Sequence, residues 1–296
     1  KSIASIDLKE FFKSRYSPSL SIGLEYKKLN FTQLVKDKTY GNGDQMQSEY
    51  NNSYSAELIY PLNNLQLEFS LRKTLNQKFD NQNTHRFGIS YKNKNKKIFF
   101  NHSTAFKNPT FTERFGYYAE TFKGNPNLKP ENIRQYEIGY SISSTKEKFN
   151  ISQTFYNSKL KNEINGSASH PGGGYTAENI GSNSYRKGLE TKLKYKINKY
   201  SNASISYNYV DSTEYNSTSG IQQAEVRRPR NILNINYDNS FSSNLHISSN
   251  IFYSSKIKDT DFSSWPYQNI YMKSYFLFNT ALNYNVDSKN KECLIF

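Results

Sequence analysis

The sequence has little of what a soluble domain uses to build its interior. Hydrophobic residues account for 35% of the 296 residues, whereas soluble globular domains contain about 45–50% apolar residues. No run of about 18 consecutive apolar residues occurs in the sequence, which excludes a transmembrane helix. The chain therefore lacks the material for a large two-layer core and for a helical membrane anchor.

Reactive side chains are also scarce, which limits the chemistry that the chain can perform. Cys293 is the single cysteine, so it cannot form an internal disulfide, and the four histidines are not clustered with other metal ligands. His246 and Ser248 share a face of one alternating segment, but that face looks inward, and His102 and Ser103 lie on opposite faces. Because catalysis needs a specific arrangement of groups, we predict no catalytic residues, no metal site, no cofactor and no enzyme activity.

Basic residues outnumber acidic ones, and the formal net charge is +14. Nucleic-acid binding would explain this excess, but the lysines and arginines are scattered and form no basic stripe or recognition helix. We therefore interpret most of them as parts of solvated strand faces and loops, and we expect no nucleic-acid partner. Those near the outer rim of a membrane protein could also pair with anionic lipid headgroups.

What the sequence does contain is a repeated alternation of apolar and polar residues. In the segment 65–71, leucine or phenylalanine at every second position alternates with glutamine, glutamate or serine. A period of two indicates β-strands, and an apolar face backed by a strongly polar face is typical of a barrel wall with lipid outside and water inside. We predict the start of a strand at 292–296 and twelve complete strands before it, centred on 19–28, 53–62, 65–75, 85–92, 97–105, 133–143, 149–157, 186–197, 203–211, 230–238, 244–253 and 274–285.

The connections between these strands alternate in length. Every second connection is tight, as at Asn63-Asn64, whereas most of the others are long and span 29–52, 76–84, 106–132, 158–185, 212–229 and 254–273. Outer-membrane barrels have short periplasmic turns and long extracellular loops. The sequence therefore predicts an all-β fold, a transmembrane antiparallel β-barrel whose long connections face the cell exterior.

The region 106–140 carries the first of three motifs that go beyond periodicity. It joins F-K-N-P-T at 106–110 to G-N-P-N-L-K-P-E at 124–131 and then to Y-E-I-G-Y at 136–140. The prolines of the second segment favour extended backbone at the residues before them, and Gly124 permits a turn with positive φ. The local interpretation is an outer loop that re-enters the sheet.

Two further motifs follow along the chain. N-I-G at 179–181 precedes K-G-L-E at 187–190, where Gly188 lets a neighbour approach closely and Glu190 points into the lumen. R-R-P-R at 227–230 precedes the next strand. In order and spacing the three motifs resemble TonB-dependent outer-membrane receptors, although the histidine of the family's R-R-P-x-H pattern is missing. The residues that carry the resemblance are Pro109, Gly124, Asn125, Pro126, Leu128, Pro130, Glu131, Asn179, Gly181, Gly188, Glu190, Arg228 and Pro229.

The resemblance implies a larger architecture than this chain contains. Barrels of that family have about 22 strands and a plugged lumen, and the chain corresponds to roughly the ninth strand through the start of the twenty-first. The expectation is a partial barrel over 1–296, truncated at both ends, without the N-terminal plug or the last strands. It should form a curved, unclosed sheet whose poorly paired edges are 20–28 and 274–296.

The function that the resemblance implies is active uptake across the outer membrane of a Gram-negative bacterium. Such a receptor takes up a scarce, bulky small molecule or metal chelate, of the cobalamin, ferric siderophore or haem class. Its partners would be outer-membrane lipid, the ligand and, through the missing plug, a TonB-type energy-coupling protein. A passive diffusion porin of about 12 strands is the main alternative, and a surface β-adhesin, a soluble β-sandwich or an outer-membrane enzyme is less favoured. The pattern does not select a ligand, because specificity depends on variable loops.

Aromatic residues in the long connections are the candidates for ligand contact. Rigid aromatic side chains provide a large contact area at low entropic cost, which suits the capture of a bulky ligand. An aromatic girdle at the membrane interface is the competing interpretation, and it is favoured for strand-end residues such as Tyr26, Tyr60 and Tyr140. The candidate ligand-contact residues are Tyr117, Tyr118, Phe122, Tyr175, Trp265 and Tyr267.

Overall fold

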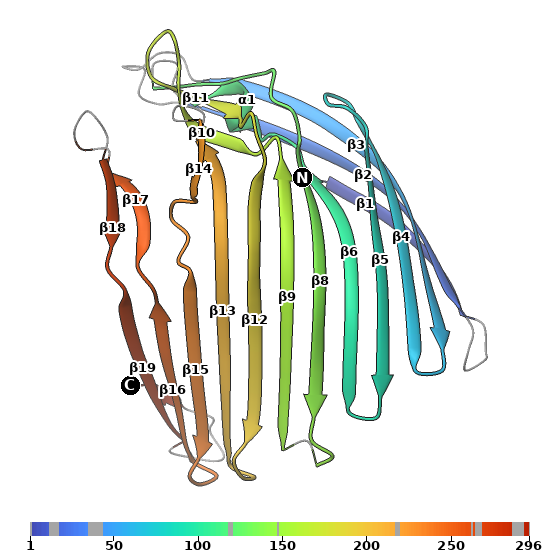
Figure 1. Ribbon diagram of the computed structural model, residues 1–296, viewed down its shortest axis with the longest axis vertical. Coiled ribbons are helices and arrows are strands. Elements are labelled where there is room, and N and C mark those ends of the chain that lie inside the picture. Colours follow the sequence, from blue (N-terminus) through green and yellow to red (C-terminus); the bar gives the residue numbers. More distant parts are fainter. Residues whose placement is uncertain are drawn as a thin grey trace.

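The protein is built on one large antiparallel sheet that curves across its width like part of a barrel wall (Figure 1). Over the described residues the two ends of this sheet do not pair with each other, so the wall is open. The predicted curved, unclosed antiparallel sheet is therefore confirmed. The computed structural model describes residues 2–11, 18–34, 44–117, 121–146, 148–216, 220–261, 263, 268–285 and 293–295.

Each strand of the wall pairs with the strands that precede and follow it along this path. β14 (Ile221–Ala224) pairs antiparallel with the last residues of β13. The wall strands follow one another across the sheet in the order in which they occur in the chain, and each runs antiparallel to its neighbours. In order across the described wall, the strands are β1 (Ser2–Phe11), β2 (Ser19–Gln33), β3 (Gln45–Leu62), β4 (Leu65–Asn76), β5 (Gln82–Asn93), β6 (Lys96–Lys107), β8 (Glu131–Ser143), β9 (Phe149–Lys161), β12 (Ser184–Lys196), β13 (Ser201–Asn216), β15 (Asn231–Ser240), β16 (Leu245–Ser254), β19 (Tyr275–Asn285) and β20 (Cys293–Ile295).

One of the shortest connections of the wall uses a residue that tolerates a left-handed backbone. Only Asn63 and Asn64 separate β3 from β4, and Asn63 has a φ of 54°. Asparagine enters this region at a lower cost than most residues. The resulting register pairs Leu62 with Leu65, so that the apolar residues of both strands share one face.

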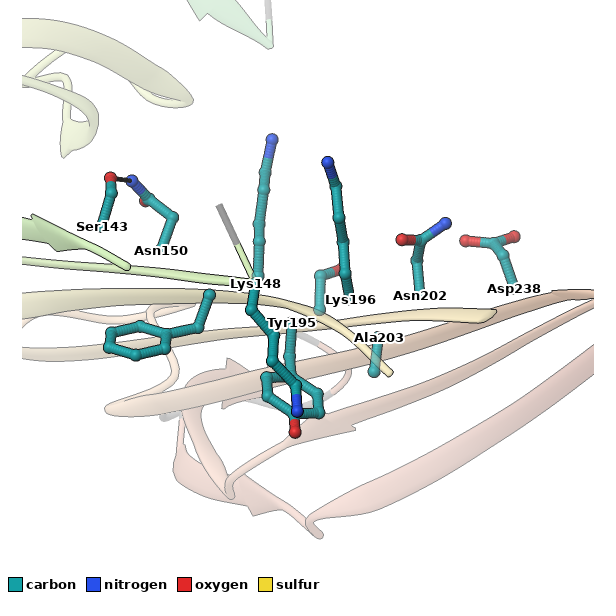
Figure 2. Close-up of a pocket in the computed structure, with 11 residues that line it drawn as sticks. Ser143, Lys148, Asn150, Tyr195, Lys196, Asn202, Ala203 and Asp238 are labelled. Carbon is teal, nitrogen blue, oxygen red and sulfur yellow. Dashed lines mark hydrogen bonds between the residues drawn. The ribbon is translucent and has the colours of Figure 1, made fainter. Parts of the chain in front are cut away.

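One face of the wall is apolar and the other is polar. Near the tight turns that join β8 to β9 and β12 to β13, Tyr195 points to one side of the sheet, whereas Lys196 and Asp238 point to the other (Figure 2). The same residues help to line a hollow of about 610 Å³ at this end of the wall. Leu71 and Phe278, on the apolar face, are 65% and 67% exposed. Such exposure suits a surface that lipid covers.

The edges of the wall differ in part from the sequence prediction. Residues 2–11, which lie before the first strand predicted from the sequence, form β1 and pair with β2 along their whole length. The segment 20–28 therefore lies between two paired strands, and the prediction that it is an edge is wrong. The alternation of apolar and polar residues is hard to see in this segment, because Ile3 and Phe11 occupy positions where polar residues are expected. At the other edge β20 pairs with β19 at three positions, so this edge is only partly paired, as predicted.

The long connections are shorter than predicted and contain structure of their own. β2 and β3 reach Gln33 and Gln45, which shortens the connection expected at 29–52, and the one expected at 76–84 spans only 77–81. Within the described residues, no helix is long and apolar enough to cross a membrane. The additional elements are α1 (Phe111–Phe115), β7 (Phe122–Lys123), β10 (Ile164–Ser169), β11 (Tyr175–Asn179), β17 (Ile257–Asp261) and β18 (Gln268–Met272).

Buried apolar side chains gather at the loop end of the sheet, outside the wall itself. There α1 lies beside β10 and β11 (Figure 1), and β10, β11 and β7 form a separate small sheet. Phe122, Leu128 and Ala177 form its buried cluster. We call the described residues of 107–131 and 161–184 the cap.

Candidate functional site

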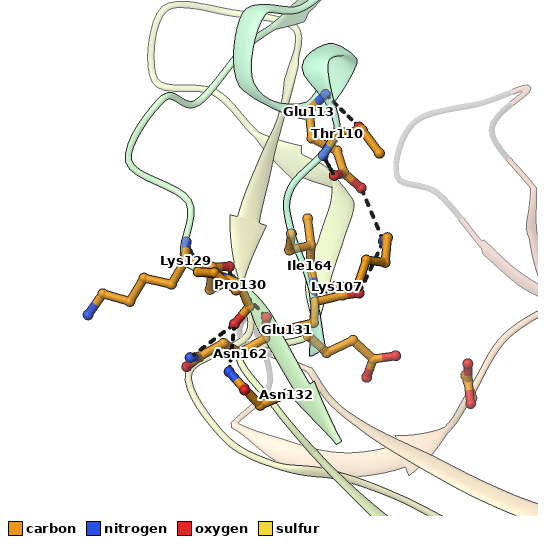
Figure 3. A network of polar contacts seen from close by, with 12 residues as sticks. Lys107, Thr110, Glu113, Lys129, Pro130, Glu131, Asn132, Asn162 and Ile164 are labelled. Carbon is orange, nitrogen blue, oxygen red and sulfur yellow. Dashed lines mark hydrogen bonds and ion pairs between the residues drawn. The ribbon is translucent and has the colours of Figure 1, made fainter. Parts of the chain in front are cut away.

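The cap begins with a short helix whose first turn is closed by its own side chains. The Thr110 hydroxyl accepts a hydrogen bond from the Glu113 amide at 3.2 Å, and the Glu113 carboxylate accepts one from the Thr110 amide at 2.6 Å (Figure 3). This reciprocal arrangement satisfies amides that a helix start leaves unpaired. α1 ends at Gly116, whose φ of 74° favours glycine. The chain thus turns sharply after Pro109, which is buried.

Glu131 joins both halves of the cap to the wall. One carboxylate oxygen accepts a hydrogen bond from the Ile164 amide at 2.8 Å, and the other lies 3.0 Å from the Lys107 ammonium. The Pro130 carbonyl accepts a hydrogen bond from the Asn132 side chain at 3.1 Å (Figure 3). These contacts hold the end of β6, the start of β8 and the start of β10 together.

Asn125 and Asn179 bridge the G-N-P loop to β11. The Asn179 side chain accepts from the Lys129 amide at 2.8 Å and donates to the Lys129 carbonyl at 2.9 Å. The Asn125 side chain donates to the Ala177 carbonyl at 2.9 Å. An asparagine side chain carries the same donor and acceptor as a peptide group. Both residues therefore replace backbone pairing between segments that are far apart in the sequence.

Gly124 lets the cap loop pack directly on α1. A Cβ atom at Gly124 would lie 2.3 Å from the Arg114 carbonyl oxygen, and one at Gly116 would lie 2.4 Å from the Phe122 carbonyl oxygen. No side chain fits at such distances, so the motif glycine is needed for this contact. Gly124 does not adopt the positive φ that the sequence suggested. The other motif residues differ in burial. Leu128 is buried, Pro229 is half-buried, and Pro126 and Gly181 are exposed.

A buried ion pair that the sequence did not predict ties the cap to β3. Arg114 of α1 lies 2.7 Å from Glu49, and both side chains are only 5% exposed. The guanidinium also lies 4.9–5.0 Å from the ring centres of Phe79, Phe111 and Phe115. Charge and cation–π attraction are stronger where water is excluded. In the sequence, the position of Arg114 between two phenylalanines is a signal for the cation–π contacts. No comparable signal marks its ion-pair partner Glu49, which is 65 residues away.

A second unpredicted charge cluster links the second and third motifs. Arg186 of β12 lies 2.6 Å from Glu163 and 2.8 Å from Glu225, to which it also donates through Nε at 3.0 Å. Arg228, a motif residue, lies 2.8 Å from the same Glu225 carboxylate. Burial alone would raise the pKa of Glu225, but the hydrogen bonds from Arg186 and Arg228 outweigh burial and hold the pKa below its usual value of 4.5.

Acidification is expected to loosen this cluster. Because the pKa of Glu225 is lowered in the folded state, its carboxylate stabilises the loop above the unfolded-state value of 4.5, and this contribution is lost as the pH falls through the folded-state pKa. Hydrogen-exchange protection factors for amides in 220–230 of the full-length protein should therefore decrease at acidic pH. The Glu225→Gln variant should show little of this dependence, and an unchanged dependence would assign it to another group.

Gly188 and Glu190 lie on the lumen face of β12. A Cβ atom at Gly188 would lie 2.3 Å from the Tyr209 carbonyl oxygen and 2.5 Å from the Tyr156 hydroxyl. The Tyr156 side chain therefore occupies the space that a larger residue would need. Glu190 is exposed two residues farther along the same face, where it presents a carboxylate to the lumen.

Gly188→Ala is expected to destabilise the protein by about 1–3 kcal/mol, because the packed neighbours must move. Gly181→Ala is the matched control, since nothing lies within 4 Å of a Cβ atom at that motif position, and its effect should stay within about 0.5 kcal/mol. Urea unfolding of the full-length protein in lipid vesicles measures both. Equal effects would show that the lumen face at Gly188 can relax.

The candidate ligand-contact residues fall into three groups. Tyr117 is 43% exposed and stacks on Phe122 with ring centres 5.2 Å apart. Phe122 itself is 8% exposed, so it serves as a core residue of the cap, and Tyr175 packs against the same cluster. The candidates outside the described residues are Tyr118, Trp265 and Tyr267.

Two contacts around histidines were also not predicted. On the apolar face the Nε2 atoms of His85 and His102 lie 3.3 Å apart. On the polar face the Ser248 hydroxyl lies 3.1 Å from His246 Nε2 and 2.5 Å from an Asp238 oxygen. Asp238 thus bonds to the serine and lies 3.8 Å from His246 Nε2, whereas in a Ser–His–Asp triad the carboxylate accepts a hydrogen bond from the imidazole Nδ1. In the part of the chain that the structure describes, no three His, Cys, Asp or Glu side chains group as metal ligands.

Comparisons with known proteins confirm the resemblance seen in the motifs. Residues 5–291 match the family described as TonB dependent receptor-like, beta-barrel. The vitamin B12 transporter BtuB of Photobacterium profundum is 28% identical over 201 residues, which cover 66% of this chain and 31% of that protein.

Solved receptor structures resemble the fold closely. The ferric enterobactin receptor PfeA of Pseudomonas aeruginosa superposes with a TM-score of 0.73 at 18% identity, over 97% of this chain and 46% of that one. The siderophore receptor PirA of Acinetobacter baumannii gives a TM-score of 0.75 at 16% identity, over 97% and 48%. The chain thus spans about half the length of these receptors and about a third of the curated relative. With a family match over nearly its whole length, the chain belongs to the TonB dependent receptor-like β-barrel family of the Gram-negative outer membrane.

Proposed function

We propose that the chain is part of a receptor that takes up a scarce, bulky nutrient across the outer membrane, driven by a TonB-type energy-coupling protein. The cap is the observation that supports this most strongly. Its motif loops are tied to each other by side-chain hydrogen bonds and to β3 by a buried ion pair, which give the extracellular end of the wall a defined surface. A defined surface suits recognition of one ligand class more than unselective diffusion. The proposed role is transport without catalysis.

The ligand that we propose is cobalamin, a ferric siderophore or haem. The curated relative is a vitamin B12 transporter, and the solved relatives are receptors for ferric enterobactin and siderophores. Tyr117, Trp265 and Tyr267 are the proposed contact residues, because large planar ligands bind well to rigid aromatic rings. Tyr117 is the one of these that the structure describes, and it stacks on the cap's core.

We further propose that other strands complete this wall and that a plug fills its lumen. In the described sheet β1 and β20 remain apart, and an open edge in hydrocarbon leaves backbone groups unpaired at several kcal/mol each. This cost disfavours a self-contained porin of about 12 strands. A ligand can drive transport only by favouring one arrangement of a movable element, and a plug would supply that element and the contact with the coupling protein.

Growth assays on the full-length protein test this proposal. The gene is expressed in a Gram-negative host that lacks its own receptors, and cobalamin, ferric siderophores and haem are each supplied at limiting concentration. One ligand class should support growth, and only when the host's TonB-type protein is functional. Growth that persists without the coupling protein, or that is equal for all solutes, would indicate a passive pore.

Tyr117→Ala should then weaken binding of that ligand by about tenfold or more, because truncation of an exposed aromatic anchor removes a large contact. Tyr54→Ala is the matched control, since Tyr54 is similarly exposed, at 50% against 43%, but lies on the apolar face of β3. Ligand titration of the purified full-length variants measures both. Unchanged affinity for Tyr117→Ala would remove this residue from the contact surface.

A further inference from the structure

A compact group of basic side chains lies on the outward face of the wall, where β8, β9 and β12 approach the cap. Arg134, Lys159, Lys161 and Lys187 form this group, which we call the basic patch. Arg134 lies directly opposite Lys159 in the register, and Lys187 lies opposite Asn157. Because neighbouring strands are about 4.8 Å apart, the patch is roughly 10 Å wide.

The patch continues directly from the apolar band of the wall. Arg134 shares the outward face of β8 with Tyr136 and Ile138, which are 45% and 52% exposed. Phe155, 46% exposed, occupies the same level on β9. Toward the cap the apolar run of β8 ends at Tyr136, and the next outward residue is Arg134. Since aromatic residues mark the boundary between hydrocarbon and headgroups, the guanidinium lies at headgroup level.

Carboxylates of the described residues do not pair with three of these four charges, those of Arg134, Lys159 and Lys161. Over the described residues the outward faces of β8, β9 and β12 carry no aspartate or glutamate. Neither Arg134 nor Lys161 forms an ion pair within the described part of the chain. Like charges directly opposite each other destabilise a sheet. The pairing of Arg134 with Lys159 therefore calls for an anion from outside the protein.

Asp211 of β13 lies beside the patch and already has two basic partners. Lys187, whose side chain is 68% exposed, lies 3.4 Å from Asp211, and Arg230 lies 3.3 Å from the same residue. The Lys159 ammonium nitrogen lies 5.9 Å from the centre of the Tyr185 ring, a cation–π contact that does not neutralise its charge. Arg134, Lys159 and Lys161 thus have no carboxylate partner among the described residues, and their charges remain available on the outward face.

The geometry points to a binding site for the phosphorylated headgroup of an outer-leaflet lipid. Phosphate oxygens accept the paired hydrogen bonds of a guanidinium and attract the lysine ammonium groups. Acyl chains of the same lipid would lie along Tyr136, Ile138 and Phe155, directly below the patch. This continuity favours a lipid over a free phosphate ion. The long loops mark this end of the wall as extracellular, and the site lies on the opposite face from the lumen, so it does not depend on which nutrient is transported.

Lipid titration of the full-length protein tests the site. The protein is delipidated in detergent and titrated with a diphosphorylated lipid A, with the same lipid after removal of its phosphates, and with inorganic phosphate. Native mass spectrometry counts the bound molecules and yields dissociation constants. Each basic residue near a membrane surface contributes about fivefold in affinity, so Arg134→Gln/Lys159→Gln should bind the diphosphorylated lipid about 30-fold more weakly than the wild type. The dephosphorylated lipid should not distinguish the two proteins.

A matched control removes the same charge from the other end of the same hairpin. Lys146 and Lys148 lie at the tight connection between β8 and β9, and Lys146→Gln/Lys148→Gln should leave the affinity within about twofold. Lys161→Gln/Lys187→Gln provides a second test if the first variant does not fold, and it should also weaken binding. Equal affinity in patch and control variants would overturn the proposal. Saturation by inorganic phosphate at the same concentration as the lipid would also overturn it, because the site would then bind a soluble anion.

Discussion

Arg114→Met is expected to release the cap from β3 at a cost of about 3–5 kcal/mol. Removal of one partner from a buried ion pair leaves the other charge without compensation, and Glu49 is only 5% exposed. The variant also loses the cation–π contacts with Phe79, Phe111 and Phe115. Hydrogen-exchange protection of the described amides in 108–130, measured on the full-length protein, should fall accordingly. The wall should retain its protection, because its strands pair without the cap.

Arg72→Met provides the matched control for this effect. Arg72 lies 2.9 Å from Glu25, but these side chains are 38% and 30% exposed, and exposed ion pairs contribute about 0–1 kcal/mol. The double variant Arg114→Met/Glu49→Gln should recover part of the lost protection, because it removes the unpaired carboxylate. If Arg114→Met and Arg72→Met have the same small effect, the buried pair does not hold the cap in place.

Leu67→Arg is expected to destabilise the wall by about 2–4 kcal/mol if the residue lies near the bilayer midplane, because it moves a charge into hydrocarbon. Leu67 belongs to the outward apolar run of β4 and lies opposite Tyr60 of β3 and Ile89 of β5. Its neighbour Gln66 lies on the lumen face and donates to Glu68 at 2.7 Å. An arginine at Gln66 would find water and this carboxylate, so Gln66→Arg should cost far less.

The two substitutions lie at adjacent positions on opposite faces of β4. The difference between them therefore tests which face of the wall contacts lipid and which faces the lumen. Unfolding of the full-length protein in vesicles of defined lipid gives the free energy for each. Equal tolerance of arginine at Leu67 and Gln66 would contradict the assignment. A larger loss at Gln66 would reverse it.

Local patterns in the sequence identified the wall and its family. A lipid face and a lumen face impose the same chemical alternation on every strand, so the period of two can be read segment by segment. The two-residue connection at Asn63-Asn64 sets the register of its hairpin without help from the rest of the fold. The alternation did not reveal the strand at residues 2–11, where its contrast is weak and pairing with β2 decides the structure. The three motifs, confirmed by the family match over 5–291, carried the family assignment.

The cap was decided by tertiary structure. Arg114 and Glu49 are 65 residues apart and Arg186 and Glu225 are 39 apart, and no local pattern shows that they meet. Whether distant charges pair depends on the register of the strands that carry them and on the path of the loops between them. The same holds for Phe122, whose aromatic ring suggested a ligand contact until packing against Leu128 and Ala177 showed it to be buried. A period reports only the faces of one strand, whereas burial and ion pairing depend on contacts between segments that the chain brings together after the strands have formed.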